Sequence, residues 1–219
     1  MHTQIDMNSI DTIFLDMDGT LLDLHYDNHF WQDFLPQRYA QYHQIDLERA
    51  NKILVPKFKA HEGTLNWYCL DFWSNELKMD IASMKEEVAH LIDIHDGVIE
   101  FLEAMQATEK RIILLTNAHR KVLELKMRYT LLEVKFDALI SSHDLGLPKE
   151  HPDFWSRLEE IEKFEPDRTL FVDDSLPVLR SAQQYGVKYL LTIYQPSSKE
   201  APRDIKEFPV LRSFTDLIP

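Results

Sequence analysis

Short apolar runs alternate with longer stretches of helical periodicity over most of the chain. The apolar runs are too short for helices and predict strands that are buried on both faces of a sheet. They cover residues 12–15, 111–115, 136–140, 169–172 and 189–193. Stretches that predict helices lie between the later runs, at residues 119–132, 151–164 and 176–185. This order predicts right-handed βαβ units, and so an α/β fold with a mostly parallel, Rossmann-like sheet.

The interval between the first two predicted strands is much longer than a simple crossover needs. It shows no convincing strand pattern but four helical ones, at residues 28–43, 46–62, 65–77 and 83–92. Pro56 is expected to kink or end the second of these helices, and Asp96 to cap a further helix over residues 97–107. We therefore predict an α/β core formed by residues 1–24 and 94–219, with residues 25–93 inserted as a helical cap.

The amino-acid composition argues against some classes of protein and favours others. The chain has 219 residues, with 37 acidic and 24 basic side chains and a formal charge of −13. This excess argues against binding to nucleic-acid phosphates, which needs Lys and Arg, and an anionic substrate would need locally placed positive charge. A hydrophobic share of 44% fits a globular protein with a substantial core. Without a membrane-length apolar run or an apolar leader, we expect no membrane association and a cytoplasmic protein.

The cysteine and histidine residues show no spacing that is typical of a zinc site. Cys69 is the single cysteine, so no intrachain disulfide and no Cys-based zinc site is expected, and it is interpreted as a small buried hydrophobic residue. Ten histidines are present, but no pair has HExxH or HxH spacing. Most of them are therefore interpreted as surface or core residues.

The first predicted strand runs directly into the sequence DMDGT at residues 16–20. Asp16 and Asp18 would stand at the carboxyl end of a parallel strand, where open α/β sheets bind ligands. Alternation along a strand would send the two side chains apart, but Gly19 allows the chain to turn so that both can face one ligand. Two carboxylates this close favour a cation between them, and hard oxygen ligands suit Mg²⁺.

Three other strand ends also carry polar side chains. Thr116 and Asn117 follow the second strand, where their hydroxyl, amide and backbone N–H groups suit an anion, although either residue could simply cap the next helix. Lys149 comes from a turn after the third strand, and a lysine standing alone there would be solvated. Asp173 and Asp174 follow the fourth strand. Acids in a loop are usually surface residues, but at the end of a central strand they are candidate metal ligands.

These motifs resemble those of the haloacid dehalogenase-like (HAD) hydrolase superfamily. The corresponding residues are DMDGT at 16–20, LLTN at 114–117, Lys149, and VDDS at 172–175. The helical insert resembles the α-helical C1 cap of that superfamily. The resemblance implies a Mg²⁺-dependent phosphatase in which Asp16 is the nucleophile and forms an aspartyl-phosphate. Further implied roles are general acid and base for Asp18, phosphate binding for Thr116 and Lys149, and metal binding for Asp16, the Asp18 main-chain carbonyl, Asp173 and Asp174.

The charge balance adds one expectation to these roles. Four carboxylates at one sheet edge would repel a phosphate dianion unless a cation offset their charge. Mg²⁺ is therefore expected to bind before or with the substrate, and Lys149 is expected to be the main cation that the protein supplies at the site.

The cap sequence narrows the resemblance further. Residues 27–31 and 64–74, with LLTNAH at 114–119 and PKE at 148–150, are similar to bacterial GMP/IMP nucleotidases. This similarity implies a purine nucleoside 5′-monophosphate as the substrate. The candidate substrate contacts are Asn28, Trp67, Asp71, Asn117 and His119.

The cap aromatic residues allow two interpretations. The four rings of Trp67, Tyr68, Phe72 and Trp73 suit stacking on a nucleobase. The same helical spacing also fits the cap's own core or its seam with the α/β domain. Asn28, Asp71 and His119 likewise either contact substrate or simply begin and cap helices.

Several other functions are compatible with parts of the pattern. A haloacid dehalogenase would share the nucleophile, but it needs no metal and no leaving-group acid, and Asp18 argues against it. A phosphatase or mutase acting on a sugar phosphate or phosphoglycolate would share every catalytic residue and differ only in the cap. A catalytically silent binding module would lack one of the acids, whereas this chain has them all.

Overall fold

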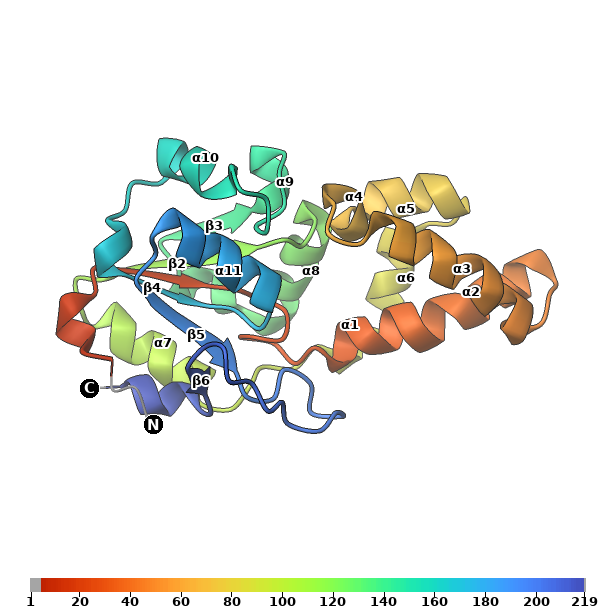
Figure 1. Ribbon diagram of the computed structural model, residues 1–219. Coiled ribbons are helices and arrows are strands. Elements are labelled where there is room, and N and C mark those ends of the chain that lie inside the picture. Colours follow the sequence, from red (N-terminus) through yellow and green to blue (C-terminus); the bar gives the residue numbers. More distant parts are fainter. Residues whose placement is uncertain (1–4, 219) are drawn as a thin grey trace.

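A computed structural model describes residues 5–218 and contains a six-stranded parallel sheet (Figure 1). The strands are β1 (Thr12–Leu15), β2 (Arg111–Thr116), β3 (Ala138–Ser141), β4 (Thr169–Val172), β5 (Tyr189–Ile193) and β6 (Val210–Leu211). Their order is β3-β2-β1-β4-β5-β6, so the first strand lies inside the sheet between β2 and β4. In such a sheet the ligand crevice lies at the carboxyl ends of the strands where the winding reverses, here β1 and β4. The predicted parallel α/β sheet is confirmed, and β6 is too short to leave a pattern in the sequence.

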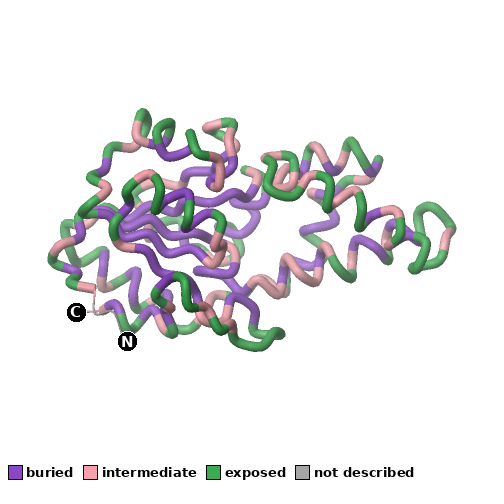
Figure 2. Tube along the Cα trace, viewed as in Figure 1, coloured by how far each residue is buried: buried purple, intermediate pink, exposed green. Residues whose placement is uncertain are grey.

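Helices cover both faces of the sheet. The core helices are α7 (Val98–Gln106), α8 (Arg120–Thr130), α9 (Ser142–Leu145), α10 (Phe154–Ile161) and α11 (Leu176–Tyr185). Alternation along the strands divides the interior, because Ile13 and Leu15 pack with residues of α7 and α8, whereas Phe14 packs with residues of α10 and α11. Figure 2 shows the middle of the sheet buried, and β1 and β4 are buried along their whole length. None of the helices within residues 5–218 is long and apolar enough to cross a membrane.

A second group of helices forms a lobe beside the sheet (Figure 1). It consists of α1 (His25–His29), a π-helical turn (Phe30–Phe34), α2 (Leu35–His43), α3 (Leu47–His61), α4 (Leu65–Tyr68), α5 (Leu70–Leu77) and α6 (Ile81–Glu87). We call this lobe the cap. Its interior is continuous with the core, since Tyr26, Phe30 and Trp73 belong to the same buried cluster as Ile13 and Leu15.

Three local expectations differ from the structure in whole or in part. Of the two outcomes expected at Pro56, the end of the helix is wrong, because α3 continues to His61. The helix expected over residues 65–77 is interrupted at Cys69, whose backbone is extended and whose Sγ accepts the Phe72 N–H at 3.4 Å. Asp96 does not cap α7. Gly97 takes that position with a φ of 80°, a left-handed conformation that suits glycine, and a Cβ there would lie 3.0 Å from Thr215.

Candidate active site

The first strand delivers two aspartates to the centre of the sheet edge. Asp16 directly follows β1, and its backbone N–H still bonds the neighbouring strand β4, so the sheet fixes its position. Gly19 has a φ of 78° and turns the chain just after Asp18. The two carboxylates have different partners, because Asp16 accepts a hydrogen bond from Lys149 and Asp18 accepts one from Lys126.

Lys149 is buried between acids of two motifs. Its Nζ donates to Asp16 Oδ1 at 2.5 Å and to Asp173 Oδ2 at 2.7 Å. The Leu115 carbonyl at 3.0 Å accepts the third N–H, so the ammonium group has used all its donors. Only 2% of the side chain is exposed, and little water screens the two ion pairs. In the structure, Lys149 therefore contacts both Asp16 of the DMDGT motif and Asp173 of the VDDS motif.

Burial sets the proton affinities of this group. It raises the pKa of Asp16 to about 6 and that of Asp173 to about 6, although Lys149 opposes both shifts. Burial, followed by the negative charge of Asp16, raises the pKa of Asp174 to about 7. Burial would lower the pKa of Lys149, but Asp16 and Asp173 together raise it. The lysine is therefore a fixed positive charge, and the three carboxylates would be stabilised by a further cation.

Asp16, Asp173 and Asp174 form a compact set of oxygen donors. One carboxylate oxygen from each lies within 4.8 Å of the others. The DMDGT turn approaches this set closely, since a Cβ at Gly19 would lie 2.9 Å from the Asp174 carboxylate. Hard oxygen donors of this kind fit Mg²⁺ or a similar divalent cation. The Asp18 side chain, which binds Lys126, is not part of this set.

The second motif supports the lysine turn. Asn117 Oδ1 accepts the Lys149 backbone N–H at 2.8 Å, and its Nδ2 donates to Glu150 Oε2 at 2.9 Å. Thr116 Oγ1 accepts the Ala118 N–H at 3.0 Å, so its hydroxyl lies at the end of β2. Asn117 therefore holds Lys149 in position through the backbone.

A second buried ion-pair network surrounds Asp18. Lys126 on α8 binds Asp18 Oδ1, and it also donates to Asp27 Oδ2 at 2.5 Å. Lys85 on the cap helix α6 donates to Asp27 Oδ1 at 2.5 Å. Burial raises the pKa of Asp18 to about 6 against the opposing charge of Lys126. For Asp27, Lys126 and Lys85 overcome the effect of burial and lower the pKa to about 2. Asp18 thus holds its proton to higher pH than Asp27.

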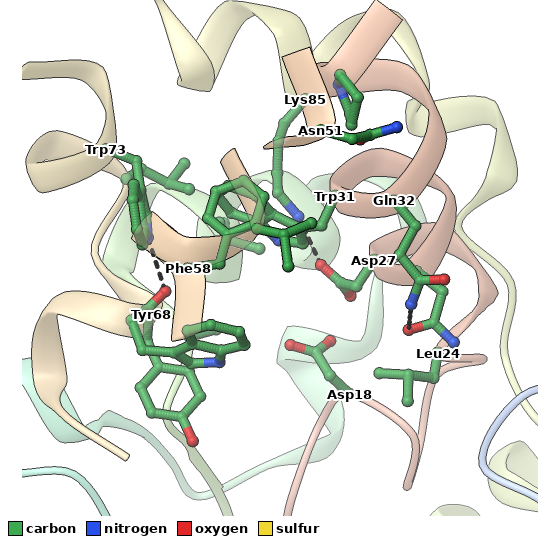
Figure 3. Close-up of a pocket in the computed structure, with 17 residues that line it drawn as sticks. Asp18, Leu24, Asp27, Trp31, Gln32, Asn51, Phe58, Tyr68, Trp73 and Lys85 are labelled. Carbon is green, nitrogen blue, oxygen red and sulfur yellow. Dashed lines mark hydrogen bonds and ion pairs between the residues drawn. The ribbon is translucent and has the colours of Figure 1, made fainter. Parts of the chain in front are cut away.

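A cavity of about 520 Å³ lies between the sheet edge and the cap, with Asp18 in its lining. This volume is in the range of small-molecule sites. In Figure 3, Asp18 and Asp27 lie on one side of the cavity, and Tyr68 and Trp73 lie on the other. The cavity therefore combines an acidic wall with an aromatic wall.

The cap aromatic residues divide between the two roles that the sequence left open. Trp73 is buried against Trp31 and Phe58 at ring separations of 6.1 and 5.0 Å, so it belongs to the cap's own core as well as to the cavity wall. Phe72 packs on His61 at 4.5 Å and is not among the cavity-lining residues. The half-buried ring of Trp67 lines the cavity.

Other substrate candidates lie in different places. Asn28 lines the cavity and donates to Glu200 at 3.0 Å. Asp71 and His119 are not among the lining residues, and Asp71 forms an exposed ion pair with Lys121 at 2.5 Å. Substrate contact by Asp71 or His119 therefore stays a prediction that the shape of the cavity does not favour.

Several residues of the site were missed in the sequence. Lys126, Asp27 and Lys85 lie within helices, where a charged residue usually faces solvent. Arg203 comes from the irregular segment after β5 and donates to the Asp174 carbonyl at 2.9 Å. For Tyr68, which the sequence suggested as a stacking ring, the missed feature is its link to the lysine turn, since its hydroxyl donates to Glu150 at 3.0 Å.

Comparisons with known proteins agree with this arrangement. A sequence model of the haloacid dehalogenase-like hydrolases matches residues 10–186. The GMP/IMP nucleotidase YrfG of Escherichia coli (strain K12) is 39% identical over 219 residues, covering 100% of this chain and 99% of that protein.

Solved structures show the same fold at lower identity. The HAD phosphatase from Thermococcus onnurineus superposes with a TM-score of 0.77 at 21% identity, over 95% of each chain. A putative beta-phosphoglucomutase from Thermotoga maritima has a TM-score of 0.68 at 17% identity, over 95% of this chain and 97% of that one. With the family match spanning most of the sequence, the chain belongs to the haloacid dehalogenase-like hydrolases.

Proposed function

We propose that this protein is a Mg²⁺-dependent phosphomonoester hydrolase whose substrates are purine nucleoside 5′-monophosphates, GMP and IMP in particular. The observation that carries the proposal is the buried Asp16–Lys149 pair at the sheet edge, followed two residues after Asp16 by Asp18, which lines a cavity with an aromatic wall. The 39% identity to a GMP/IMP nucleotidase over the whole chain supports the choice of substrate.

Asp16 is assigned as the nucleophile. Its oxygen attacks phosphorus, the bond to the ribose 5′ oxygen breaks, and Asp16 becomes an aspartyl-phosphate. Asp18 donates a proton to the departing oxygen, and its carboxylate then takes a proton from the water that attacks the same phosphorus. The second step releases inorganic phosphate and restores Asp16. A pKa of about 6 for Asp18 suits a group that must exist in both protonation states near neutral pH.

The positive charges at the site have separate tasks. Lys149 holds Asp16 and supplies positive charge beside the transferring phosphoryl group, and Thr116 offers its hydroxyl at the end of β2. Asp16, Asp173 and Asp174 would hold the metal ion. Mg²⁺ bound there would supply positive charge that offsets the charge of the carboxylates and of the phosphoryl oxygens. Without it, three acids and one lysine would leave a negative site facing a dianion.

The cavity supports a direction for the leaving group. Asp18 lines it, whereas Asp16 is not among the lining residues. A phosphoryl group at Asp16 would therefore place the rest of the substrate past Asp18 and into the cap. We assign residues 25–93 the role of a substrate-binding cap, in which Trp67 contacts the base and Asn28 contacts the base or ribose.

A phosphate-release assay over a panel of monoesters tests the proposal. With Mg²⁺, GMP and IMP should be hydrolysed with higher kcat/KM than ribose 5-phosphate, glucose 1-phosphate, phosphoglycolate or pyrimidine nucleotides. EDTA should abolish release, and added Mg²⁺ should restore it. Preference for a sugar phosphate would overturn the nucleotide assignment alone. Turnover that survives EDTA would overturn the metal-dependent mechanism.

Replacing Lys126 by Met should change the pH dependence of the reaction. Turnover needs Asp18 protonated, so kcat/KM should fall as pH rises through the pKa of Asp18. The Lys126 charge lowers that pKa, and the remaining negative charge of Asp27 raises it. The alkaline limb of the kcat/KM profile should therefore move to higher pH in Lys126→Met.

Lys121→Met is the matched control, because Lys121 lies on the same helix in an exposed ion pair with Asp71. Its pH profile should equal that of the parent. An alkaline limb that stays in place or moves to lower pH in Lys126→Met would contradict the role assigned to Asp18.

A further inference from the structure

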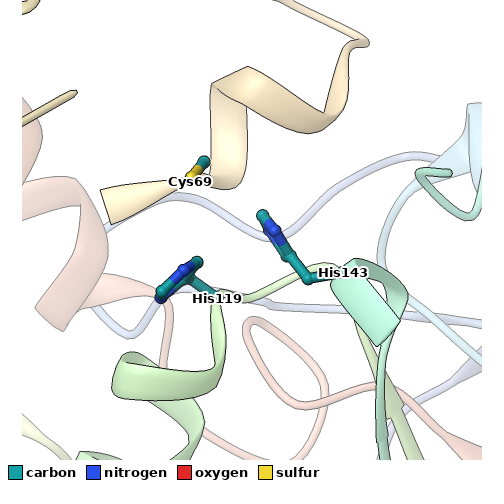
Figure 4. A group of neighbouring side chains, drawn as sticks. All are labelled: Cys69, His119 and His143. Carbon is teal, nitrogen blue, oxygen red and sulfur yellow. The ribbon is translucent and has the colours of Figure 1, made fainter. Parts of the chain in front are cut away.

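Three metal-ligating side chains meet at the seam between cap and core, outside the aspartate cluster (Figure 4). Cys69 lies between the cap helices α4 and α5, His119 precedes α8, and His143 lies on α9. One ligand atom from each residue lies within 4.8 Å of the other two. The two imidazole rings are 4.9 Å apart and nearly perpendicular.

The hydrogen bonding and the charge of the two histidines favour binding of a metal ion. His143 Nε2 is enclosed and has no hydrogen-bond partner among residues 5–218, which is costly for a buried polar atom. Burial, followed by the neighbouring His119, lowers the pKa of His143 to about 4, and burial also lowers the pKa of His119. Both rings are therefore neutral at pH 7, which is the form that binds metals.

The donor set differs from that of the aspartate cluster. A thiolate with two imidazoles suits Zn²⁺ and related transition metals, whereas carboxylates alone suit Mg²⁺. Tetrahedral zinc with bonds of about 2.0–2.3 Å holds its ligand atoms roughly 3.3–3.6 Å apart. The three atoms lie within 4.8 Å of one another, so each pair would close by at most about 1.5 Å on binding. His119 Nδ1 accepts the Lys121 N–H at 3.4 Å, which leaves Nε2, 3.7 Å from Asp71 Oδ2, as the ligand atom of this ring.

The geometry points to a second metal site, in which Cys69, His119 and His143 bind a transition-metal ion of the Zn²⁺ type. Cys69 belongs to the cap and both histidines belong to the core, so the bound ion ties the two together. The single cysteine gave no sign of this site in the sequence, because both imidazoles come from distant segments.

Cobalt provides a direct probe of the site. The reduced protein is titrated with Co²⁺ in excess Mg²⁺, which occupies the aspartate cluster. A thiolate-to-cobalt charge-transfer band in the near ultraviolet should appear and saturate at one equivalent, and Zn²⁺ should displace it. Cys69→Ser should lose the band, and His143→Asn should weaken Co²⁺ binding by at least about tenfold. The exposed histidine variant His90→Asn is the matched control and should bind Co²⁺ like the parent.

Two further measurements keep the test decisive if a variant folds poorly. Asp16→Asn should keep the band, because the aspartate cluster holds no sulfur. Co²⁺ binding that is lost in Asp16→Asn and unchanged in Cys69→Ser would assign the cobalt to the aspartate cluster and overturn the proposal. In the parent, one equivalent of Zn²⁺ should slow alkylation of Cys69, which intact mass reports unambiguously because the chain has one cysteine. Absence of the band from the folded parent, or equal alkylation rates with and without Zn²⁺, would also overturn the proposal.

Discussion

Asp16→Asn should abolish phosphate release from every substrate, by on the order of 10⁴–10⁶-fold, the scale of loss when a nucleophile is removed. The amide cannot attack phosphorus, so no aspartyl-phosphate can form. The substitution nearly preserves side-chain volume, and Lys149 keeps Asp173 as an ionic partner at 2.7 Å. The variant should therefore fold, and its thermal unfolding should be cooperative like that of the parent.

Two measurements check this expectation. Steady-state phosphate release reports the loss of turnover, and acid-quenched protein should carry a phosphoryl group in the parent and none in Asp16→Asn. Asp167→Asn is the matched control, since Asp167 is exposed and should tolerate the same change. Activity of Asp16→Asn within tenfold of the parent would refute the nucleophilic role.

Lys149→Met should impair both folding stability and catalysis. The buried ammonium pairs with Asp16 and Asp173, and removing one partner of a buried ion pair costs about 3–5 kcal/mol of unfolding free energy. Turnover should fall by on the order of 10³-fold, because the protein's own charge opposite the phosphoryl group is lost.

The stability loss should depend on pH with a definite sign. The Lys149 charge lowers the pKa of Asp16 and Asp173, so without it both values lie further above those of the unfolded chain. A carboxyl group with a raised pKa in the folded state destabilises the fold as pH rises. The deficit of Lys149→Met should therefore be larger at pH 8 than at pH 5.

Urea unfolding at the two pH values measures this difference. Lys163→Met, at an exposed lysine, serves as the control and should change the unfolding free energy by less than about 1 kcal/mol. Added Mg²⁺ should stabilise Lys149→Met by binding the freed carboxylates. An unfolding free energy equal to the parent's at pH 8 would mean that the lysine is not the counter-charge of this cluster.

The sequence was sufficient for the first five strands and for the polar residues at their ends, because both depend on local pattern. A buried parallel strand needs a short apolar run, and the first polar residue after it must stand at the sheet edge, as Asp16, Thr116 and Asp173 do. Lys126 gave no such signal. Its partners Asp18 and Asp27 are 108 and 99 residues away in the chain, and Asp27 comes from the cap.

The cap was harder to predict for the same reason. Aromatic residues at helical spacing indicate that one face of the helix is buried. They do not indicate whether that face lines a cavity or packs against another helix. Trp67 and Trp73 differ only in what packs against them, which is decided by segments far away in the chain. The break at Cys69 was also hidden, since a cysteine seldom caps a helix.

Because the cap and the core share one hydrophobic interior, the cap cannot simply be replaced by the cap of a relative in order to change the substrate preference. Tyr26, Phe30 and Trp73 pack in the same cluster as residues of the sheet and of α8. A foreign insert grafted onto this core would face α8 side chains shaped for other neighbours, and each large side chain left with a void costs about 2–5 kcal/mol. A chimera that keeps its stability must therefore exchange the contact surface of α8 together with the insert.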